Sequence, residues 1–198
     1  MKTIMMFSLF LFVVAPVCAV AQTAGENLLK NGDFEKFTGD NPDSWETPNI
    51  PGTLTVVSPS KNPHAGARAV KCEVKDFGGT LLAGYICQKG IQTGGKDFKV
   101  SGAFLVRSME KDQGVVLLCF VNSGGSTVGT TEEYIDDTKS KYIEFSKEIK
   151  PPPGTAAVNL RVTVFPDKGG EKTHVGSYVV CDDLKLVAIA PAEKPPIQ

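Results

Sequence analysis

Short stretches in which apolar and polar residues alternate recur along most of the sequence, separated by turns rich in glycine and proline. The clearest is Phe98–Arg107, where every second residue from Phe98 to Val106 is apolar or glycine. Successive side chains of a β-strand point to opposite faces of the sheet, so this alternation predicts a strand with one buried face. No window shows a helical period. Strands spaced by roughly ten residues with Gly and Pro turns are typical of a β-sandwich.

Other strands are expected in runs that alternate less regularly. They are Gly52–Ser58, Arg68–Val74, Thr80–Gln88, Val115–Val121, Ser126–Tyr134, Tyr142–Ile149, Ala157–Phe165 and Ser177–Ile189. In Ala157–Phe165 the even-numbered residues are apolar and are predicted to face the core. Pro59–Gly66 is expected to be a loop, and Trp45, the only tryptophan, is expected to fill the core.

Composition and charge narrow the functional classes. The 198 residues fit one domain, and 41% hydrophobic residues suffice for a core. Basic residues number 21 and acidic residues 22, which gives a net charge of −1. Nucleic-acid binding and attachment to an anionic membrane surface both need a basic excess that this chain lacks.

The first 21 residues are typical of a signal peptide. Lys2 precedes an apolar run, and Ala19-Val20-Ala21 forms an A-x-A cleavage site. The run ends at Pro16 and is shorter than the roughly 20 residues that a membrane span requires. We therefore expect cleavage after Ala21 and export to the periplasm, the cell surface or the medium. Lipid attachment at Cys18 is the alternative, although Val17 stands where a lipobox favours a small residue.

After cleavage, the expected domain is 22–190, followed by a disordered Pro-rich tail at 191–198. The domain keeps Cys72, Cys87, Cys119 and Cys181, all inside predicted strands. Export permits disulfides, while strand positions also suit buried free thiols, so both states remain open.

Three segments carry a family resemblance. Asn27–Glu35 reads NLLKNGDFE and is followed by Pro42 and Trp45; His64–Val70 reads HAGARAV; and Val180–Leu186 reads VCDDLKL. In this order they resemble the first strand, a strand entry and the last strand of carbohydrate-binding modules of the CBM4/9/16/22 type. Those modules belong to the galactose-binding-domain-like superfamily. The resemblance covers nearly the whole mature chain and implies an all-β jelly-roll sandwich of two antiparallel sheets.

The same resemblance implies a structural Ca²⁺ ion. Glu35 and Asp182 match the family's ligand positions, with carbonyl oxygens expected from the loop between Ser60 and Gly66. Asp182 shares the parity of Val180, Leu184 and Leu186, which predicts a carboxylate on the core side that needs a cation or several donors. The alternative is that Asp182 accepts hydrogen bonds from loop N–H groups without a metal.

Sugar binding would use the strand faces that point away from the core. Aromatic rings pack on the C–H faces of sugars, and planar polar side chains bind hydroxyl groups or a uronate. The candidate ligand-binding residues are Tyr85, Gln88, Arg107, Asn159 and Arg161, with Phe165 beside them. By position they match the concave sheet that holds the cleft in the family.

Catalysis is not expected. The adjacent acidic pairs Glu132-Glu133, Asp136-Asp137 and Asp182-Asp183 cannot flank one bond when they lie in a strand, because neighbours point to opposite faces. His64 and His174 lie far apart, and no G-x-S-x-G motif is present. The sequence therefore predicts a non-catalytic exported domain that binds an oligo- or polysaccharide. The alternative is a scaffold for other cell-envelope proteins that does not bind sugar.

Overall fold

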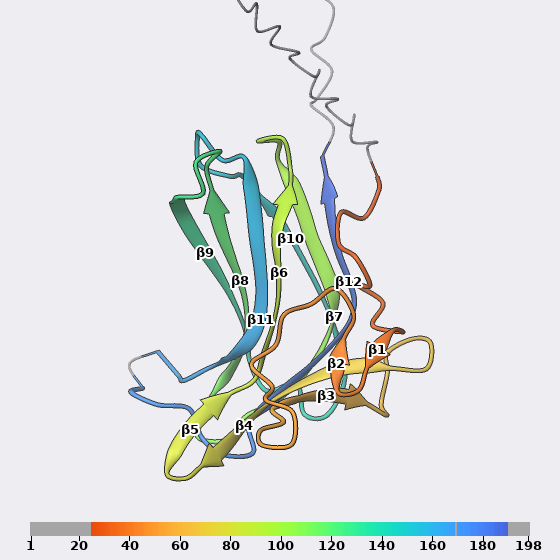
Figure 1. Ribbon diagram of the computed structural model, residues 1–198, viewed down its shortest axis with the longest axis vertical. Coiled ribbons are helices and arrows are strands. Elements are labelled where there is room, and N and C mark those ends of the chain that lie inside the picture. The colour runs from red at the N-terminus through yellow and green to blue at the C-terminus, as the bar shows by residue number, and fades with distance from the viewer. Residues whose placement is uncertain (1–24, 169, 190–198) are drawn as a thin grey trace, which may run out of the picture.

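The computed structural model describes residues 25–168 and 170–189 and shows two stacked β-sheets (Figure 1). The predicted signal peptide at 1–21, Cys18 and the predicted tail at 191–198 lie outside the described residues. The strands are β1 (Phe37–Thr38), β2 (Asn41–Pro42), β3 (Val57–Ser60), β4 (Ala69–Phe77), β5 (Thr80–Ala83), β6 (Tyr85–Gln92), β7 (Phe98–Arg107), β8 (Gln113–Val121), β9 (Thr127–Ile135), β10 (Ile143–Ile149), β11 (Ala157–Phe165) and β12 (Tyr178–Ala188).

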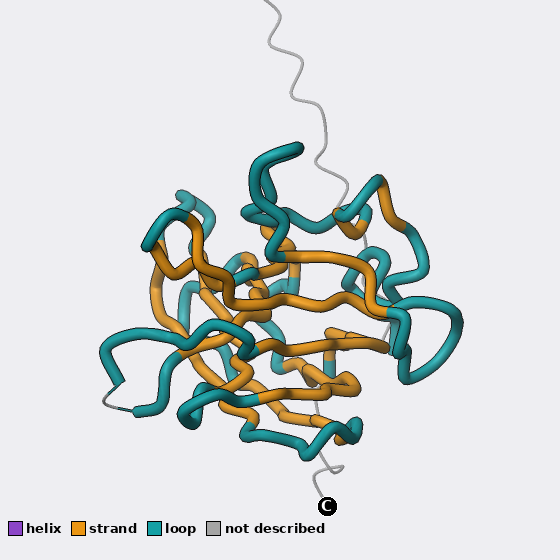
Figure 2. Tube along the Cα trace, turned by 90° about the horizontal axis from the view of Figure 1, so that it is seen from below, coloured by secondary structure: helices purple, strands orange, loops and turns teal. Residues whose placement is uncertain are grey.

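Every strand pairing in the described residues is antiparallel. One sheet has six strands in the order β10-β7-β12-β4-β3, with β5 also paired to β4. The other has four strands in the order β6-β11-β8-β9, and β1 and β2 form a small hairpin. Seen from below, the strands stack in layers and the loops project around them (Figure 2). This arrangement confirms the predicted all-β sandwich. No helix in the described part of the chain is long and apolar enough to cross a membrane.

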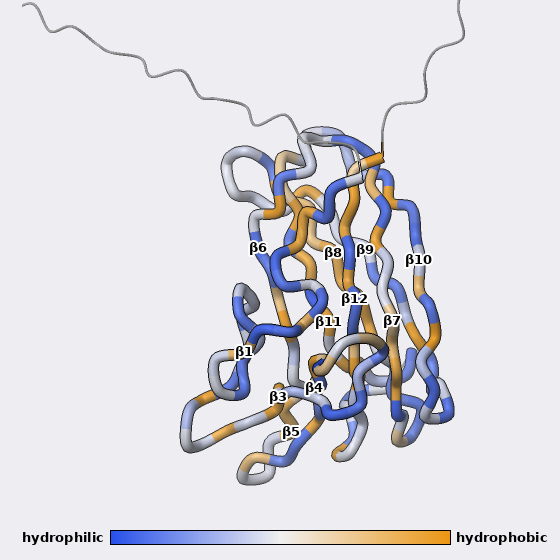
Figure 3. The backbone as a smooth tube through the Cα atoms, turned by 90° about the vertical axis from the view of Figure 1, so that its right-hand side faces the viewer, coloured by the Kyte–Doolittle hydropathy of each residue, from blue (hydrophilic) through white to orange (hydrophobic). Residues whose placement is uncertain are grey.

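The core lies between the two sheets and follows the predicted alternation. The inward residues of β11 are Val158, Leu160, Val162 and Val164, and all four belong to the main hydrophobic cluster. Residues of β4 and β7 join the same cluster: Val70, Cys72, Val74, Phe98, Val100, Phe104 and Val106. Figure 3 colours the chain by hydropathy and shows hydrophobic stretches along the strands. Trp45 is also in the cluster, which confirms it as a core residue, and its indole N–H points to the carbonyls of Lys30 and Asn31.

Some strand boundaries differ from the predictions. Gly52–Ser58 is not one strand, since only its last two residues belong to β3 and Leu54 pairs back with Ile50 in a tight loop. Thr80–Gln88 is divided at Gly84, where a Cβ would lie 2.2 Å from the Val56 carbonyl oxygen. At this glycine the chain passes from the six-stranded sheet, which contains β5, to the four-stranded sheet, which contains β6.

The first described segment is held against the last strand. The backbone N–H of Leu28 donates to the Leu186 carbonyl, and that of Leu184 donates to the Gly32 carbonyl. Gly32 is required here because a Cβ would lie 2.2 Å from the Leu184 carbonyl oxygen. Both ends of the described chain therefore lie side by side at the same end of the sandwich (Figure 1).

A β-bulge in β12 overturns the predicted orientation of Asp182. The register with β7 shifts between Asp182 and Lys185, and Asp183 adopts a φ of 51°. A bulge inserts an extra residue and so exchanges the two faces of the strand. Val180 accordingly packs in a small cluster on the outer side of the six-stranded sheet, whereas Leu184 lies in the main core. Asp182 is buried, but under a loop on the outer side rather than toward the core.

Candidate functional site

The outward face of the four-stranded sheet carries the side chains that best suit sugar binding. We call this surface the Arg161 face, and define it by Tyr85, Glu132, Tyr134, Arg161 and Phe165. Because the apolar residues of β11 point inward, Arg161 and Phe165 point outward. Directly across the sheet, Arg161 is opposite Cys87 on one side and Leu117 on the other.

The Arg161 guanidinium packs over an aromatic ring. Its guanidinium carbon lies 4.4 Å from the centroid of the Tyr85 ring, and both side chains are half-buried. A guanidinium over an aromatic face is a favourable cation–π contact that also restrains both groups. The neighbouring Cys87 thiol has a raised pKa because it is buried, and the Arg161 charge partly opposes that shift. The Tyr85 ring and the Arg161 guanidinium are therefore both fixed in position at the sheet surface.

The edge strand β9 adds a second aromatic group. The Tyr134 hydroxyl donates a hydrogen bond to the Glu132 carboxylate, and this bond raises the pKa of Tyr134. The ammonium of Lys168 lies 5.7 Å from the centroid of the Tyr134 ring. These residues were not among the sequence candidates. The alternation Thr130, Glu132, Tyr134 in β9 is the signal that would have identified them.

A pocket of about 420 Å³ opens beside Tyr85 and Arg161. Its floor includes Thr163 and Phe165. Its walls come from β5 on one side and from Pro166, Glu171, Lys172 and Thr173 on the other. The loop that forms this second wall is anchored further along at His174. The backbone N–H of His174 donates to Asp112 Oδ2, and its Nδ1 lies 3.1 Å from Asp112 Oδ1. The Asp112 side chain is fully buried, so it fixes the position of the wall.

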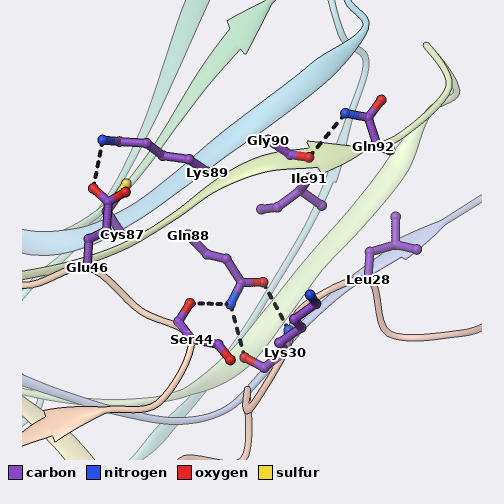
Figure 4. A pocket seen from close by; sticks show the side chains of 10 residues that line it. All are labelled: Leu28, Lys30, Ser44, Glu46, Cys87, Gln88, Lys89, Gly90, Ile91 and Gln92. Atoms are coloured by element: carbon purple, nitrogen blue, oxygen red, sulfur yellow. Dashed lines mark hydrogen bonds and ion pairs between the residues drawn. The ribbon is translucent and has the colours of Figure 1, made fainter.

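Gln88 was predicted to bind sugar, but it faces the other side of β6 from Tyr85. Positions three apart in a strand point to opposite faces. The buried Gln88 amide binds the N-terminal segment: Oε1 accepts from the Lys30 N–H at 2.9 Å, and Nε2 donates to the carbonyls of Lys30 and Ser44 (Figure 4). A pocket of about 550 Å³ adjoins it, where the ammonium of Lys89 pairs with Glu46 at 2.6 Å. The polar side chains of Gln88, Lys89 and Glu46 are therefore already bonded within the fold.

Two further candidates are placed differently from the prediction. Arg107 is the last residue of β7 and lies opposite Tyr178 in the six-stranded sheet, so it is on a different layer from Arg161. Asn159 does lie on the same strand as Arg161, but its Oδ1 accepts a hydrogen bond from the Gly90 N–H at the bulge between β6 and β11. Of the five candidates, the structure brings together Tyr85 and Arg161 as a pair, with Asn159 farther along β11.

The two predicted calcium ligands approach one loop from two sides. Glu35 Oε1 accepts hydrogen bonds from the N–H groups of Ala67 and Arg68, and Asp182 Oδ2 accepts from those of His64 and Ala65. Burial raises the pKa of Asp182, while the loop N–H groups oppose this rise.

These contacts match the alternative in which Asp182 binds loop N–H groups. Calcium takes six to eight oxygen ligands, which this set of N–H donors does not supply. Among the described residues, no group of three or more His, Cys, Asp and Glu side chains is arranged to hold a metal ion. The calcium site therefore stays a prediction.

The acidic pairs behave in two ways. Glu132 and Glu133 point to opposite faces as predicted, with Glu132 bound to Tyr134 and Glu133 in a salt bridge with Lys147. Asp182 and Asp183 do not, because the bulge turns both toward His64: Asp182 binds its N–H, and Asp183 lies 2.9 Å from its Nδ1. The four cysteines of the described region are free thiols.

Solved structures with the same architecture were found by comparison. The CBM22-1 xylan-binding domain of Paenibacillus barcinonensis Xyn10C matches with a TM-score of 0.56 and 12% identity over 87% of this chain and 100% of that domain. TmCBM61, solved with β-1,4-galactotriose, matches with a TM-score of 0.53 and 17% identity over 83% of this chain and 99% of the module.

The fold is that of carbohydrate-binding modules. This finding confirms the resemblance at the level of the fold. The enzymatically active domain of tailspike protein 4 from bacteriophage CBA120 also matches, with a TM-score of 0.59 and 15% identity over 82% of this chain, which spans only 21% of that domain. No protein-family model matches the sequence, and no curated protein matches it.

Proposed function

We propose that this protein is an exported, non-catalytic domain that holds a glycan on the Arg161 face. The observation that carries the proposal is the cation–π pair of Tyr85 and Arg161 beside a pocket on a sheet face. The fold supports it, since one structural neighbour is described as xylan-binding and another was solved with a galactotriose.

In this proposal the site is preformed. Tyr85, Tyr134 and Phe165 offer ring surfaces for the C–H groups of sugar rings, and Arg161 offers a fork of N–H donors for oxygen atoms. Arg161 and Phe165 lie on β11, which is paired on both sides, and β6, which holds Tyr85, is bridged to Glu46 of the N-terminal segment. These residues therefore need little ordering on binding. Binding involves no covalent step. Glu132 and Glu133 support a non-catalytic role, since they point to opposite faces and are each bound by another side chain.

The test is a glycan array probed with the purified protein, with calcium and again with EDTA. We expect binding to one class of polysaccharide. Loss of binding in EDTA would support the calcium prediction, whereas unchanged binding would count against a calcium-supported site. Sequencing the N-terminus of the exported protein tests cleavage after Ala21.

A matched pair of variants locates the site. Tyr85→Ala removes the ring under Arg161 and should weaken binding by about tenfold. Tyr178→Ala is the control, because this tyrosine also packs against a cation, with the Lys71 ammonium 4.5 Å from its ring centroid, but on the six-stranded sheet. If the two variants lose affinity equally, the sugar-binding site is not on the Arg161 face.

If the folded protein binds no glycan on the array, the scaffold alternative is favoured instead. A protein partner would then be sought on the outer side of the six-stranded sheet. There Ala69, Leu105 and Val180 form a small apolar cluster flanked by Tyr142 and Tyr178.

A further inference from the structure

Arg161 differs from the other arginines of the described region. Arg68 and Arg107 are exposed, whereas Arg161 is half-buried on a central strand. Lysines at comparable depth are paired: Lys71 and Lys75 both contact Glu73. Arg161 makes no salt bridge with any carboxylate of residues 25–168 and 170–189. This half-buried positive charge is therefore left without a salt bridge, and its immediate neighbours within the sheet are neutral.

Those neighbours are a phenol ring, a thiol and an aliphatic side chain. Tyr85 covers one face of the guanidinium, and Cys87 and Leu117 stand opposite Arg161 on the two adjoining strands. None of them carries a negative charge, since burial raises the pKa of the Cys87 thiol and keeps it protonated at neutral pH. Partly desolvated cations are normally paired with an anion, and a guanidinium matches the two oxygens of a carboxylate or a sulfate.

We propose that the glycan bound at the Arg161 face carries an anionic group, a uronate carboxylate or a sulfate ester, that binds the Arg161 guanidinium. This inference rests on the proposed sugar-binding function and narrows its ligand class. The pocket beside Arg161 is also lined by Lys172, and Lys168 lies over Tyr134 at the far side of the face.

Two carboxylates also lie near these cations and oppose the binding of an anion. Glu132 accepts the Tyr134 hydroxyl, and Glu171 lines the pocket on the same loop as Lys172. The cationic groups Arg161, Lys168 and Lys172 outnumber these two carboxylates. Glu132 lies on the edge strand β9 and Glu171 lies on a loop, whereas Arg161 lies on the central strand β11, so an anion is favoured at Arg161.

The experiment measures affinities of the full chain by calorimetry against matched polysaccharides. Polygalacturonate is compared with its carboxyl-reduced form, which has the same linkages without the charge, and dextran sulfate is compared with dextran. A neutral β-1,4-galactan completes the set. We expect one charged polymer to bind at least about tenfold more tightly than its neutral counterpart, and added salt to weaken this binding. Which charged polymer binds distinguishes a uronate from a sulfate.

Three variants connect this preference to the guanidinium. Arg161→Gln should reduce affinity for the charged polymer by about 10- to 100-fold and abolish the preference over the neutral one. Arg161→Lys keeps the charge without the fork and should lose less. Arg107→Gln, on the other sheet, should bind as the unmodified protein does. Circular dichroism and thermal unfolding show that each variant is folded.

The outcomes separate the two proposals. Equal binding of charged and neutral polymers overturns the anionic ligand but leaves the sugar-binding function standing. A charge preference that survives Arg161→Gln overturns the assignment to this residue. Binding to no polysaccharide, by a protein shown to be folded, overturns both.

Discussion

Replacing Gln88 by alanine tests whether its side-chain hydrogen bonds hold the N-terminal segment against β6 and stabilise the fold. The variant loses three hydrogen bonds to the backbone of Lys30 and Ser44. A hydrogen bond contributes roughly 0.5–1.5 kcal/mol net, and the freed segment can bind water from the adjoining pocket. The fixed glutamine also loses side-chain entropy, which offsets part of this contribution. We therefore expect the free energy of unfolding to fall by roughly 1–3 kcal/mol.

Urea unfolding followed by tryptophan fluorescence is the assay. Trp45 is the only tryptophan of the chain, and its indole points to the same Lys30 carbonyl that Gln88 binds. Gln88→Glu keeps the acceptor but loses both donors, so it should cost at least as much as alanine. Gln113→Ala is the control, because it removes one exposed hydrogen bond to Asp136 and should change stability by less than about 0.5 kcal/mol. If Gln88→Ala lowers the free energy of unfolding no more than this control does, Gln88 does not stabilise the fold through these hydrogen bonds.

Two further predictions concern loops. Gly66→Ala should destabilise more than Gly78→Ala. Both glycines have positive φ, so either alanine would be strained by roughly 1–2 kcal/mol, but only the first would place a Cβ 2.0 Å from Glu35 Oε1. Equal losses in urea unfolding would show that Glu35 moves freely. The pKa of Asp137 is lowered, mainly by two backbone N–H groups, so its contribution is present above its ordinary pKa of 3.8 and is lost as the pH falls through the lowered value. Asp137→Asn should therefore be less stable than the unmodified protein at pH 7, with the difference shrinking below pH 4; a constant difference would contradict this.

The strands and their buried faces were largely predictable from local pattern. Ala157–Phe165 was predicted with both boundaries correct, because a central strand of a sandwich alternates along its whole length. Tyr85 and Arg161 were correctly placed on one outward face by the same rule. The predicted outward position of Gln88 is wrong, because this residue lies an odd number of positions from Tyr85 along β6 and therefore faces the other side.

Other parts of the site depend on non-local structure. The layer on which Arg107 lies is set by strand order, which joins segments far apart in the sequence and leaves no local signal. The bulge after Asp182 shifts the strand by one residue without any glycine or proline to mark it, so parity alone placed this carboxylate on the wrong side. The missing ion pair of Arg161 likewise became visible only when its cross-strand neighbours were known.

The pairing of the first segment with the last strand has a mechanical consequence. Asn27 and Val187 form an antiparallel bridge where both ends of the described chain lie side by side. A force that separated the two ends would act across these hydrogen bonds and break them one after another, as in unzipping, before it loaded the sandwich in shear. The N-terminal segment, which Gln88 also binds, would detach first and leave the sheets and the Arg161 face intact.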